Sequence, residues 1–250
     1  MIKVLISGAL GKMGANVISA INNDPEVTAV CGVDRVQDLT GSIPVYEDIS
    51  KVTEQVDVVI DFSSPKALDG ILSFISKTGA SAVLCSTGYT KEDIEKINQA
   101  SKTNAIFRSA NMSLGVNVLI ELVKTAVKNL AGFDIEIIEK HHNLKVDAPS
   151  GTALMLADAV KEVDNDKFYV YGRNGMVGKR DANEIGIHAI RGGNIVGEHD
   201  VIFAGSDEVI TLSHHASDRK VFAFGAVKAA KYLATKKNGL YNMTDLLNNK

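Results

Sequence analysis

Two imidazoles lie close to lysine ammonium groups in a single short segment, residues 139–153. His141 and His142 are adjacent, and Lys145 follows them. A histidine side chain titrates near neutral pH and can donate a proton, while a lysine supplies a positive charge. Because successive strand residues point to opposite faces, at most one histidine faces a given pocket unless the chain kinks. The segment therefore predicts proton transfer on an anionic substrate and leaves a structural role open for one of the histidines.

A predicted helix start in the same segment adds a site for an anion. Ser150 stands at an N-cap position, ahead of an apolar-periodic run over residues 152–163. The first turn of a helix leaves backbone N–H groups without partners, and those of Gly151, Thr152 and Ala153 would point out of this N-terminus. With the histidines and the lysine, this anion cradle indicates a site for a small carboxylate substrate.

Zinc is the main alternative for two adjacent histidines. A zinc ion in a protein needs three or four ligands from cysteine, histidine and carboxylate side chains. No carboxylate or cysteine lies at a helical or hairpin ligand spacing from His141 and His142. The sequence therefore predicts no metal site here.

The beginning of the chain carries a glycine pattern suited to phosphate binding. An apolar run over residues 2–7, predicted to be a buried strand, leads into a G-x-x-G-x-x-G sequence, and a helix follows to residue 21. Glycines at these positions allow a tight turn, close approach of the backbone to a pyrophosphate and close helix–strand packing. The dinucleotide-binding residues expected here are Gly8, Leu10, Gly11, Lys12, Met13 and Gly14.

A carboxylate follows the next predicted strand. That strand covers residues 27–33, and Asp34 comes directly after it, where a carboxylate can accept a hydrogen bond from a ribose 2′-hydroxyl. Arg35 could instead bind a 2′-phosphate. We therefore expect both NADH and NADPH to serve, with a modest preference for NADH.

Strands and helices alternate through the first half of the chain. Further strands are predicted at residues 56–62, 81–85 and 104–108, with helices at 65–77 and 91–100. This βαβ succession predicts an α/β fold with a Rossmann-type, doubly wound parallel sheet, in which ligands bind beyond the carboxyl ends of the strands. The further cofactor-binding residues expected on those loops are Phe62, Ser86, Thr87, Gly88, Ala110, Asn111 and Met112.

The second half changes character. Strands are predicted at residues 133–138, 185–190, 195–204 and 209–214, with hairpin turns at 191–194 and 205–208. They predict a second α+β domain with a mixed open sheet, carrying the helix at 150–163 on one side. A long helix over residues 218–236 would return the chain to the first domain. We expect a dinucleotide-binding domain of residues 1–112 and 217–250, and a substrate-binding and oligomerisation domain of residues 113–216.

Composition excludes several classes of protein. The chain has 250 residues and a net charge of −3, which gives no electrostatic reason to expect nucleic-acid or membrane binding. No apolar run approaches the length of a bilayer span, and the first residues read as a strand rather than a signal peptide. Cys31 and Cys85 fall in buried strands and are expected to be free thiols in a reducing compartment. We expect a cytoplasmic protein with no nucleic-acid or membrane partner.

Six segments together carry a family resemblance. They are residues 8–14, 86–88, 139–153, 191–193, 197–199 and 222–226. Over essentially its whole length the chain resembles the 4-hydroxy-tetrahydrodipicolinate reductases (dihydrodipicolinate reductases). The resemblance implies reduction of a cyclic imine dicarboxylate by NADH or NADPH, with hydride delivered to ring C4 as the 4-hydroxyl leaves as water. It also implies the diaminopimelate route to lysine, and a homotetramer built through the sheets of the substrate domains.

The resemblance assigns roles within residues 139–153. Hydride addition leaves an enamine that must gain a proton, and His141 supplies it. Lys145 polarises the imine or binds a carboxylate. The substrate-binding residues implied are His142, Ser150, Gly151 and Thr152.

Two other functions remain open from the sequence. Another two-domain Rossmann oxidoreductase would need a cysteine nucleophile or a different arrangement of lysine and histidine, and neither cysteine lies in a suitable loop. A dinucleotide-sensing regulatory protein would not require Lys145 beside two histidines and a helix start. Both alternatives are therefore less favoured than the reductase.

Overall fold

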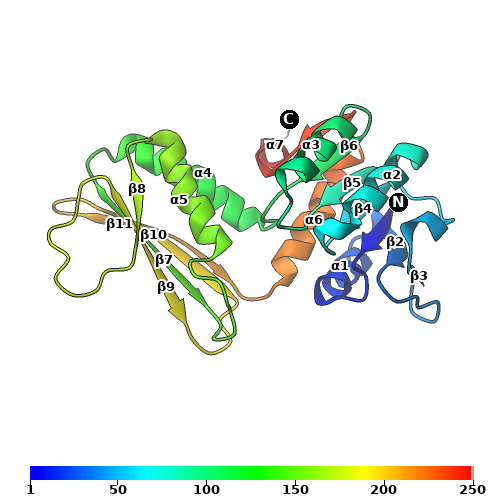
Figure 1. The fold of residues 1–250 in the computed structure, drawn as a ribbon, viewed down its shortest axis with the longest axis horizontal. Helices are drawn as coiled ribbons and strands as arrows, with labels where there is room; N and C mark the ends of the chain where they lie inside the picture. The colour runs from blue at the N-terminus through cyan, green and yellow to red at the C-terminus, as the bar shows by residue number, and fades with distance from the viewer. Residues whose placement is uncertain (249–250) are drawn as a thin grey trace. The chain divides into compact units, whose positions relative to one another are not determined.

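The computed structural model describes residues 1–248, which divide into two compact units. Unit 1 combines residues 1–114 with the segment that starts at Arg219, and unit 2 comprises residues 115–218. Each unit is built around its own sheet (Figure 1) and has its own buried apolar core. Within residues 1–248, none of the helices is long and apolar enough to cross a bilayer.

A seven-stranded parallel sheet forms the centre of unit 1, in the order β12-β6-β5-β4-β1-β2-β3. Its strands are β1 (Ile2–Ser7), β2 (Val27–Val33), β3 (Val45–Tyr46), β4 (Val58–Asp61), β5 (Ser81–Leu84), β6 (Ala105–Arg108) and β12 (Gly239–Tyr241). Val4, Leu5 and Ile6 of β1 are all fully buried. Consecutive apolar residues suit a strand that is covered on both faces, and the predicted Rossmann-type sheet is confirmed.

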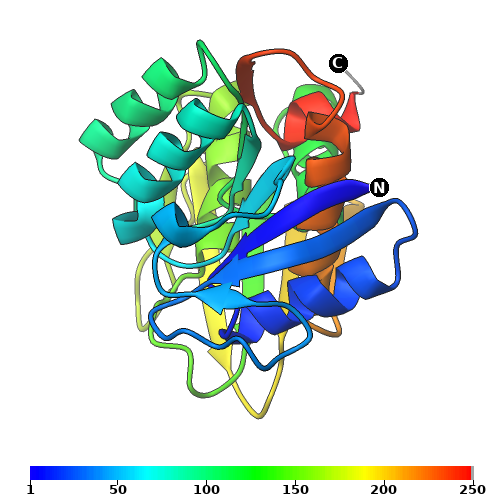
Figure 2. The ribbon, with the colours of Figure 1, turned by 90° about the vertical axis from the view of Figure 1, so that its right-hand side faces the viewer.

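Helices cover both faces of this sheet (Figure 2). One face packs against α1 (Lys12–Asn22), α6 (Lys220–Leu233) and α7 (Met243–Leu247). The other face packs against α2 (Leu68–Thr78) and α3 (Lys91–Ala100). Two short 3-10 helices, η1 (Ile49–Lys51) and η2 (Pro65–Ala67), precede α2. The predicted helix at residues 65–77 therefore begins as a 3-10 turn and becomes an α-helix only at Leu68.

Local sequence signals set the ends of these helices. Thr90 caps α3, and its side chain and that of Asp93 form a reciprocal capping box. One face of α6 is buried against the sheet through Ala226, Ala229 and Leu233. The two-residue strand β3 has no counterpart among the predicted elements, because it is too short to show a period.

Unit 2 contains a mixed five-stranded sheet in the order β11-β10-β7-β9-β8. Its strands are β7 (Asp134–His141), β8 (Phe168–Tyr171), β9 (Glu184–Arg191), β10 (Gly197–Ala204) and β11 (Val209–Ala216). Strand β7 runs parallel to β9 and antiparallel to β10. Helices α4 (Leu114–Asn129) and α5 (Gly151–Val163) pack on one face of this sheet through Val123 and Leu156. The predicted α+β unit with a mixed sheet is confirmed.

One predicted hairpin is wrong. Residues 191–194 do not join two paired strands, because β7 lies between β9 and β10 and pairs with both. Strand β7 pairs along both of its edges, and this order depends on contacts distant in sequence that a local turn signal does not report. The hairpin at residues 205–208 is confirmed, with the Gly205 N–H donating to the Glu208 carbonyl oxygen at 2.9 Å. Helix α4 and strand β8 have no counterpart among the predicted elements.

The other face of the unit 2 sheet carries a cluster of charged side chains. Glu136 of β7 accepts hydrogen bonds from Arg173, Arg180 and His188. Burial alone would raise the pKa of Glu136, but these donors outweigh it and lower the pKa from 4.5 to about 2. The cluster therefore links β7 to β9 and to the loop before β9 on this face.

We predict that Gly225→Ala destabilises unit 1. An added Cβ at Gly225 would overlap the carbonyl oxygen of Met112, and a backbone atom cannot move aside cheaply. Overpacking of this kind costs about 1–3 kcal/mol, more than the gain of about 1 kcal/mol in helix propensity. Urea unfolding would measure the loss, with Gly41→Ala as the control, because an added Cβ at Gly41 comes no closer than 3.6 Å to a neighbour. Equal stability of the two variants would contradict the prediction.

Candidate active site

The glycine loop of unit 1 is shaped by close backbone contacts. Gly8 follows β1 with a φ of +83°, a conformation that favours glycine. An added Cβ at Gly14 would overlap the carbonyl oxygen of Gly8, so α1 packs directly on the loop. Gly11 is the N-cap of α1 and has no side chain to offer to the first turn. The three glycines thus leave the backbone at this helix start open to close approach by a phosphate.

Asp34 binds this loop directly. Its Oδ2 accepts a hydrogen bond from the Leu10 N–H at 2.9 Å, and its Oδ1 accepts one from the Arg35 N–H at 2.7 Å. The carboxylate therefore joins the end of β2 to the glycine loop and stands at the rim of a hollow of about 670 Å³. Lys66, which the sequence analysis did not single out, supplies a second cation beside Arg35 in the same hollow.

The hollow gathers only part of the predicted cofactor site. Its lining is Ser7, Gly8, Gly11, Val33, Asp34, Arg35, Glu47, Phe62, Ser63, Ser64, Lys66 and Ala67. This lining offers four features that could contact a dinucleotide: the glycine loop, a carboxylate, two cations and an aromatic ring. The predicted residues outside the lining are Leu10, Lys12, Met13, Gly14, Ser86, Thr87, Gly88, Ala110, Asn111 and Met112.

A buried carboxylate holds two of the predicted loops together. Asp61, at the end of β4, is fully buried and accepts hydrogen bonds from the Ser63 N–H at 3.1 Å and the Ser86 hydroxyl at 2.6 Å. It therefore links the loop after β4 to the loop after β5. Burial, and secondarily the charge of Asp61, raises the pKa of the Cys85 thiol, so that this cysteine stays protonated. From the sequence, Asp61 was placed in the strand and given no role.

Loop residues after β6 are held by their own short contacts. The Ser109 hydroxyl donates to the Asn111 carbonyl oxygen at 2.8 Å, and the Asn111 side chain accepts from the Ser113 N–H at 2.9 Å. Asn111 and Met112 are buried. These contacts fix the turn that the sequence placed at the carboxyl edge of the sheet.

In unit 2, Glu139 is the centre of the candidate chemical site. It is fully buried, two residues before His141, on the face of β7 that packs against α4 and α5. This face is called the inner face of the sheet below. Arg191 of β9 binds both carboxylate oxygens, at 2.7 and 2.8 Å. The His141 Nδ1 lies 2.7 Å from Oε2, and the Ser150 N–H donates to Oε1 at 3.0 Å. Burial would raise the pKa of Glu139, but these donors outweigh it and hold the pKa below its usual value.

Ser150 begins α5 as predicted and makes a second connection. Its hydroxyl accepts from the Ala153 N–H at 3.2 Å and lies 3.0 Å from Nε2 of His199. His199 is buried, and its ring packs edge-to-face against that of His141 at a centroid distance of 5.2 Å. Burial lowers the pKa of His199 to about 4, and the charge of His141 acts in the same direction. His199 is therefore a neutral neighbour of His141 at physiological pH.

Lys145 lies in the loop between β7 and α5. Its Nζ is 2.8 Å from Oδ1 of Asp147, and Arg191 donates to the Asp147 carbonyl oxygen at 2.7 Å. The hydrogen bond from Lys145, opposed by partial burial, lowers the pKa of Asp147. An added Cβ at Gly151 would meet nothing within 4 Å, so the start of α5 borders open space. A carboxylate bound there would compete with Asp147 for the lysine.

The structure thus brings His141 and Ser150 into one network, with Lys145 on the adjoining loop. Glu139 opens the predicted segment but was given no role from the sequence, although its place two residues before His141 on a strand was a usable signal. Arg191 and His199 were given no role because their partners lie on other elements, and Asp147 was given none although its partner Lys145 is only two residues away. Within residues 1–248, no group of three or more histidine, cysteine or acidic side chains is arranged to hold a metal ion.

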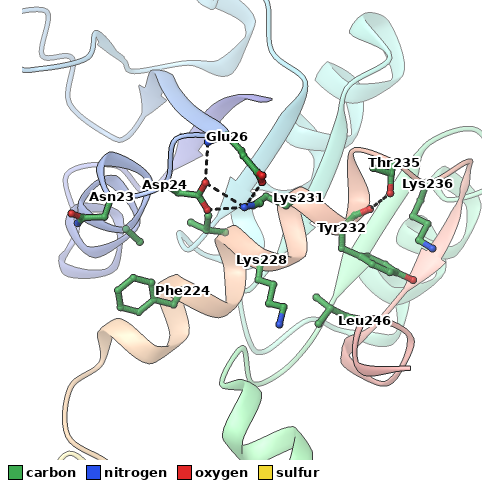
Figure 3. Close-up of a pocket in the computed structure, with 12 residues that line it drawn as sticks. Asn23, Asp24, Glu26, Phe224, Lys228, Lys231, Tyr232, Thr235, Lys236 and Leu246 are labelled. Carbon is green, nitrogen blue, oxygen red and sulfur yellow. Dashed lines mark hydrogen bonds and ion pairs between the residues drawn. The ribbon is translucent and has the colours of Figure 1, made fainter. Parts of the chain in front are cut away.

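A second hollow in unit 1 is lined by none of the predicted residues. It has a volume of about 690 Å³ and lies between α1, α6 and α7 (Figure 3). Lys231 of α6 is paired there with Asp24, at 3.0 Å, and with Glu26. These ion pairs hold α6 against the turn after α1, so Lys231 has a structural partner already.

Both halves of the chain match family models. Residues 2–112 match "Dihydrodipicolinate reductase, N-terminus", and residues 115–247 match "Dihydrodipicolinate reductase, C-terminus". A protein of Caldanaerobacter subterraneus subsp. tengcongensis called 4-hydroxy-tetrahydrodipicolinate reductase is 54% identical, over 99% of this chain and 98% of its own length. One of the same name from Clostridium novyi is 50% identical over 100% of both chains.

A solved structure has the same fold. The dipicolinate-bound dihydrodipicolinate reductase from Paenisporosarcina sp. TG-14 gives a TM-score of 0.82 at 24% identity, covering 97% of each chain. A probable dehydrogenase from Thermotoga maritima gives a TM-score of 0.62 at 11% identity, covering 98% of this chain and 92% of its own. At these identities the likeness concerns the fold alone.

We predict that His199 makes the stability of the protein fall on mild acidification. The unfolded chain takes up a proton on this histidine below about pH 6.5, whereas the folded protein does so only near pH 4. The free energy of unfolding should therefore fall as the pH drops through this window, by up to about 1.4 kcal/mol per pH unit. His199→Gln should show a shallower fall in urea unfolding between about pH 7 and pH 5. An identical slope in both proteins would contradict the prediction.

Proposed function

Because the chain belongs to the dihydrodipicolinate reductase family, we propose that it is an NAD(P)H-dependent 4-hydroxy-tetrahydrodipicolinate reductase of the diaminopimelate route to lysine. In this reaction 4-hydroxy-tetrahydrodipicolinate, NAD(P)H and a proton give tetrahydrodipicolinate, NAD(P)⁺ and water. The observation that carries the assignment is that family models match both halves of the chain, while relatives of this name are 50–54% identical over its length.

Unit 1 is the proposed dinucleotide-binding domain. The residues that would hold the cofactor include the glycine loop at Gly8–Gly14, Asp34, Arg35 and Phe62, and the backbone contacts at Gly8 and Gly14 support this assignment. When bound, the nicotinamide supplies the hydride. Ser86–Gly88 and Ala110–Met112 complete the proposed set on the loops after β5 and β6. Asp61 supports these loops by joining the first of them to the loop after β4.

Unit 2 is the proposed substrate-binding domain. One substrate carboxylate would bind at the start of α5, to the amides of Gly151 and Thr152, where the dipole of the helix also favours an anion. Lys145 would hold the other carboxylate or polarise the imine, leaving Asp147 as it does so. His142 is proposed as a further substrate contact. These groups hold the dicarboxylate while charge shifts within its ring.

His141 is the proposed proton donor. Loss of the 4-hydroxyl as water gives a conjugated imine. Hydride addition at its C4 then leaves an enamine, whose carbon must gain a proton. The His141 side chain is 12% exposed, so that a substrate can reach its ring. Its Nδ1 is engaged by Glu139, which leaves the other nitrogen for proton transfer.

The two other functions now have less support. Several solved structures of dehydrogenases share the fold, but at 11–14% identity they carry no argument about substrate. A dinucleotide-sensing protein would not need a buried Glu–Arg–His network beside a helix start. The reductase therefore remains the best-supported function.

The open face of the unit 2 sheet is proposed as a subunit interface of a homotetramer. Ile190 of β9 and Val209 of β11 lie on this face with 47% and 62% of their surface exposed. A subunit seated on this face would remove both side chains from water. We also propose a cytoplasmic location, supported by two buried cysteines that are both free thiols.

The assignment can be tested with substrate generated in situ from pyruvate and aspartate semialdehyde by the condensing enzyme. The chain should oxidise NADH and NADPH only when all components are present, and pyridine-2,6-dicarboxylate should inhibit it competitively. No oxidation of either nicotinamide with this substrate would contradict the proposed function.

We predict that Lys145→Ala and His141→Ala lose turnover but keep cofactor affinity, because both residues lie in unit 2. Loss of the general acid should lower kcat by roughly 10²-fold, and loss of the cation by at least as much. Steady-state kinetics and a fluorescence titration with NADH would measure the two effects, with Lys128→Ala on the exposed side of α4 as the control. A comparable loss of cofactor binding in either variant would show that the site is wrongly assigned.

We predict that Asp34 and Arg35 set a modest preference for NADH. A 2′-hydroxyl would donate a charge-assisted hydrogen bond to Asp34, worth about 1.5–3 kcal/mol, whereas a 2′-phosphate meets like charge that Arg35 and Lys66 offset. Asp34→Asn keeps an acceptor for the Leu10 amide and removes the charge, so it should improve kcat/KM for NADPH relative to NADH. Arg35→Ala should weaken NADPH far more than NADH. A preference of the unmodified enzyme for NADPH beyond about a hundredfold would contradict this role of Asp34.

A further inference from the structure

Four hydrogen bonds converge on the two carboxylate oxygens of Glu139. Two come from Arg191 of β9, one involves Nδ1 of His141 on β7, and one comes from the N–H of Ser150 before α5. The side chain is fully buried, so no water competes for these donors. Three separate elements therefore meet at one carboxylate.

The charge of Glu139 determines which nitrogen of His141 carries hydrogen. Despite burial, the donors lower the pKa of Glu139, so that the group is ionised and can only accept hydrogen bonds. Nδ1 of His141, at 2.7 Å, must then be the donor. A neutral His141 therefore carries its hydrogen on Nδ1, and Nε2 is the nitrogen that gains and loses the exchangeable proton.

Nε2 of His141 lies next to a glycine, Gly197. An added Cβ at Gly197 of β10 would lie only 3.1 Å from this nitrogen. A side chain at residue 197 would thus crowd the proton-donating atom, and glycine leaves room beside it. Position 197 belongs to the inner face of the sheet, the face that also carries Glu139, His141 and His199.

The same carboxylate also fixes the anion cradle. Oε1 accepts from both Arg191 and the Ser150 N–H, and Ser150 is the N-cap of α5. The Ser150 hydroxyl in turn contacts His199, whose ring packs on that of His141. The proton donor and the start of α5 are thus held to one another through Glu139 and, by a second route, through His199.

From these contacts we infer that Glu139 is a positioning residue for the proposed reduction. It keeps Nε2 of His141 directed toward the substrate, stabilises the imidazolium by its charge, and holds the start of α5 at a set distance from that ring. The inference rests on the proposed function. In the proton-transfer step, Nε2–H of the imidazolium breaks as a C–H bond forms on the enamine carbon, and the neutral imidazole keeps its Nδ1–H on Glu139. The arrangement resembles the carboxylate–histidine pair of hydrolases, in which the carboxylate orients the ring without taking the proton.

Glu139→Gln tests this role. Four donors meet the carboxylate, so an amide NH₂ in place of one oxygen must face another donor. If the amide oxygen keeps Arg191 and Ser150, the NH₂ group faces Nδ1 of His141 and reverses the tautomer of the ring. Glu139→Asp keeps the charge and should retain the wild-type tautomer.

The direct readout is the nitrogen spectrum of histidine labelled with ¹⁵N, which reports the protonated nitrogen of each ring without any turnover. We expect Nδ1–H for neutral His141 in the unmodified protein and in Glu139→Asp, and Nε2–H in Glu139→Gln. Glu136→Gln is the matched control, because Glu136 lies on the same strand with two arginines and a histidine, but on the opposite face. The ring of His141 should be unchanged in that variant.

Kinetics supply the second readout. Glu139→Gln should lower kcat by roughly 10²-fold, move the alkaline limb of the kcat profile to lower pH, and leave the KM for NADH within about twofold. Other charged and titratable groups around His141 can also affect the pH dependence of kcat. They are Glu139, Arg191, His199, His214, Lys145 and Asp147. A purely structural role would change stability without moving the pH profile.

Two results would overturn the inference. One is an Nε2–H tautomer for neutral His141 in the unmodified protein, which stays informative even if Glu139→Gln does not fold. The other is a folded Glu139→Gln variant with the wild-type tautomer and pH profile. If the unmodified chain shows no reductase activity, the proposed function fails, whereas the tautomer still tests the contact between Glu139 and His141.

Discussion

A buried negative charge is the constraint on which unit 2 depends. An isolated carboxylate inside a protein is costly, so Glu139 stays ionised only because Arg191, His141 and the Ser150 amide all donate to it. Those donors come from β9, β7 and the start of α5, and none of them can move independently while the charge is buried. The electrostatic requirement of one residue therefore sets the geometry of the proposed proton donor and of the anion cradle.

Unit 1 also contains a buried carboxylate, at the carboxyl edge of its own sheet. Asp61 is also fully buried, and it accepts hydrogen bonds from Ser63 and Ser86 on two successive loops. At the other side of the glycine loop, Asp34 accepts from the Leu10 amide. In both units a carboxylate at a strand end orders the loops that carry the proposed function, which is why loops of small polar residues can be well defined here.

Most of the fold could be predicted from local patterns, and most of the polar network could not. Apolar runs and glycine spacing were enough for the parallel sheet of unit 1, because a strand buried on both faces shows its burial in its own residues. The order of strands in unit 2 was not predictable in the same way. The turn after Arg191 looks like a hairpin locally, but pairing of β7 with both β9 and β10 depends on contacts distant in sequence. His141, Lys145 and Ser150 were found because they share one segment, whereas Arg191 and His199 reach the site from neighbouring strands.

A crystal structure with bound pyridine-2,6-dicarboxylate would test the central claim, that one site in unit 2 both binds the dicarboxylate and donates the proton. The account predicts one carboxylate on the amides of Gly151 and Thr152, Lys145 shifted from Asp147 to the ligand, and Nε2 of His141 as the ring nitrogen nearest the ligand. A dicarboxylate bound elsewhere, or with Nδ1 of His141 turned toward it and away from Glu139, would contradict the account.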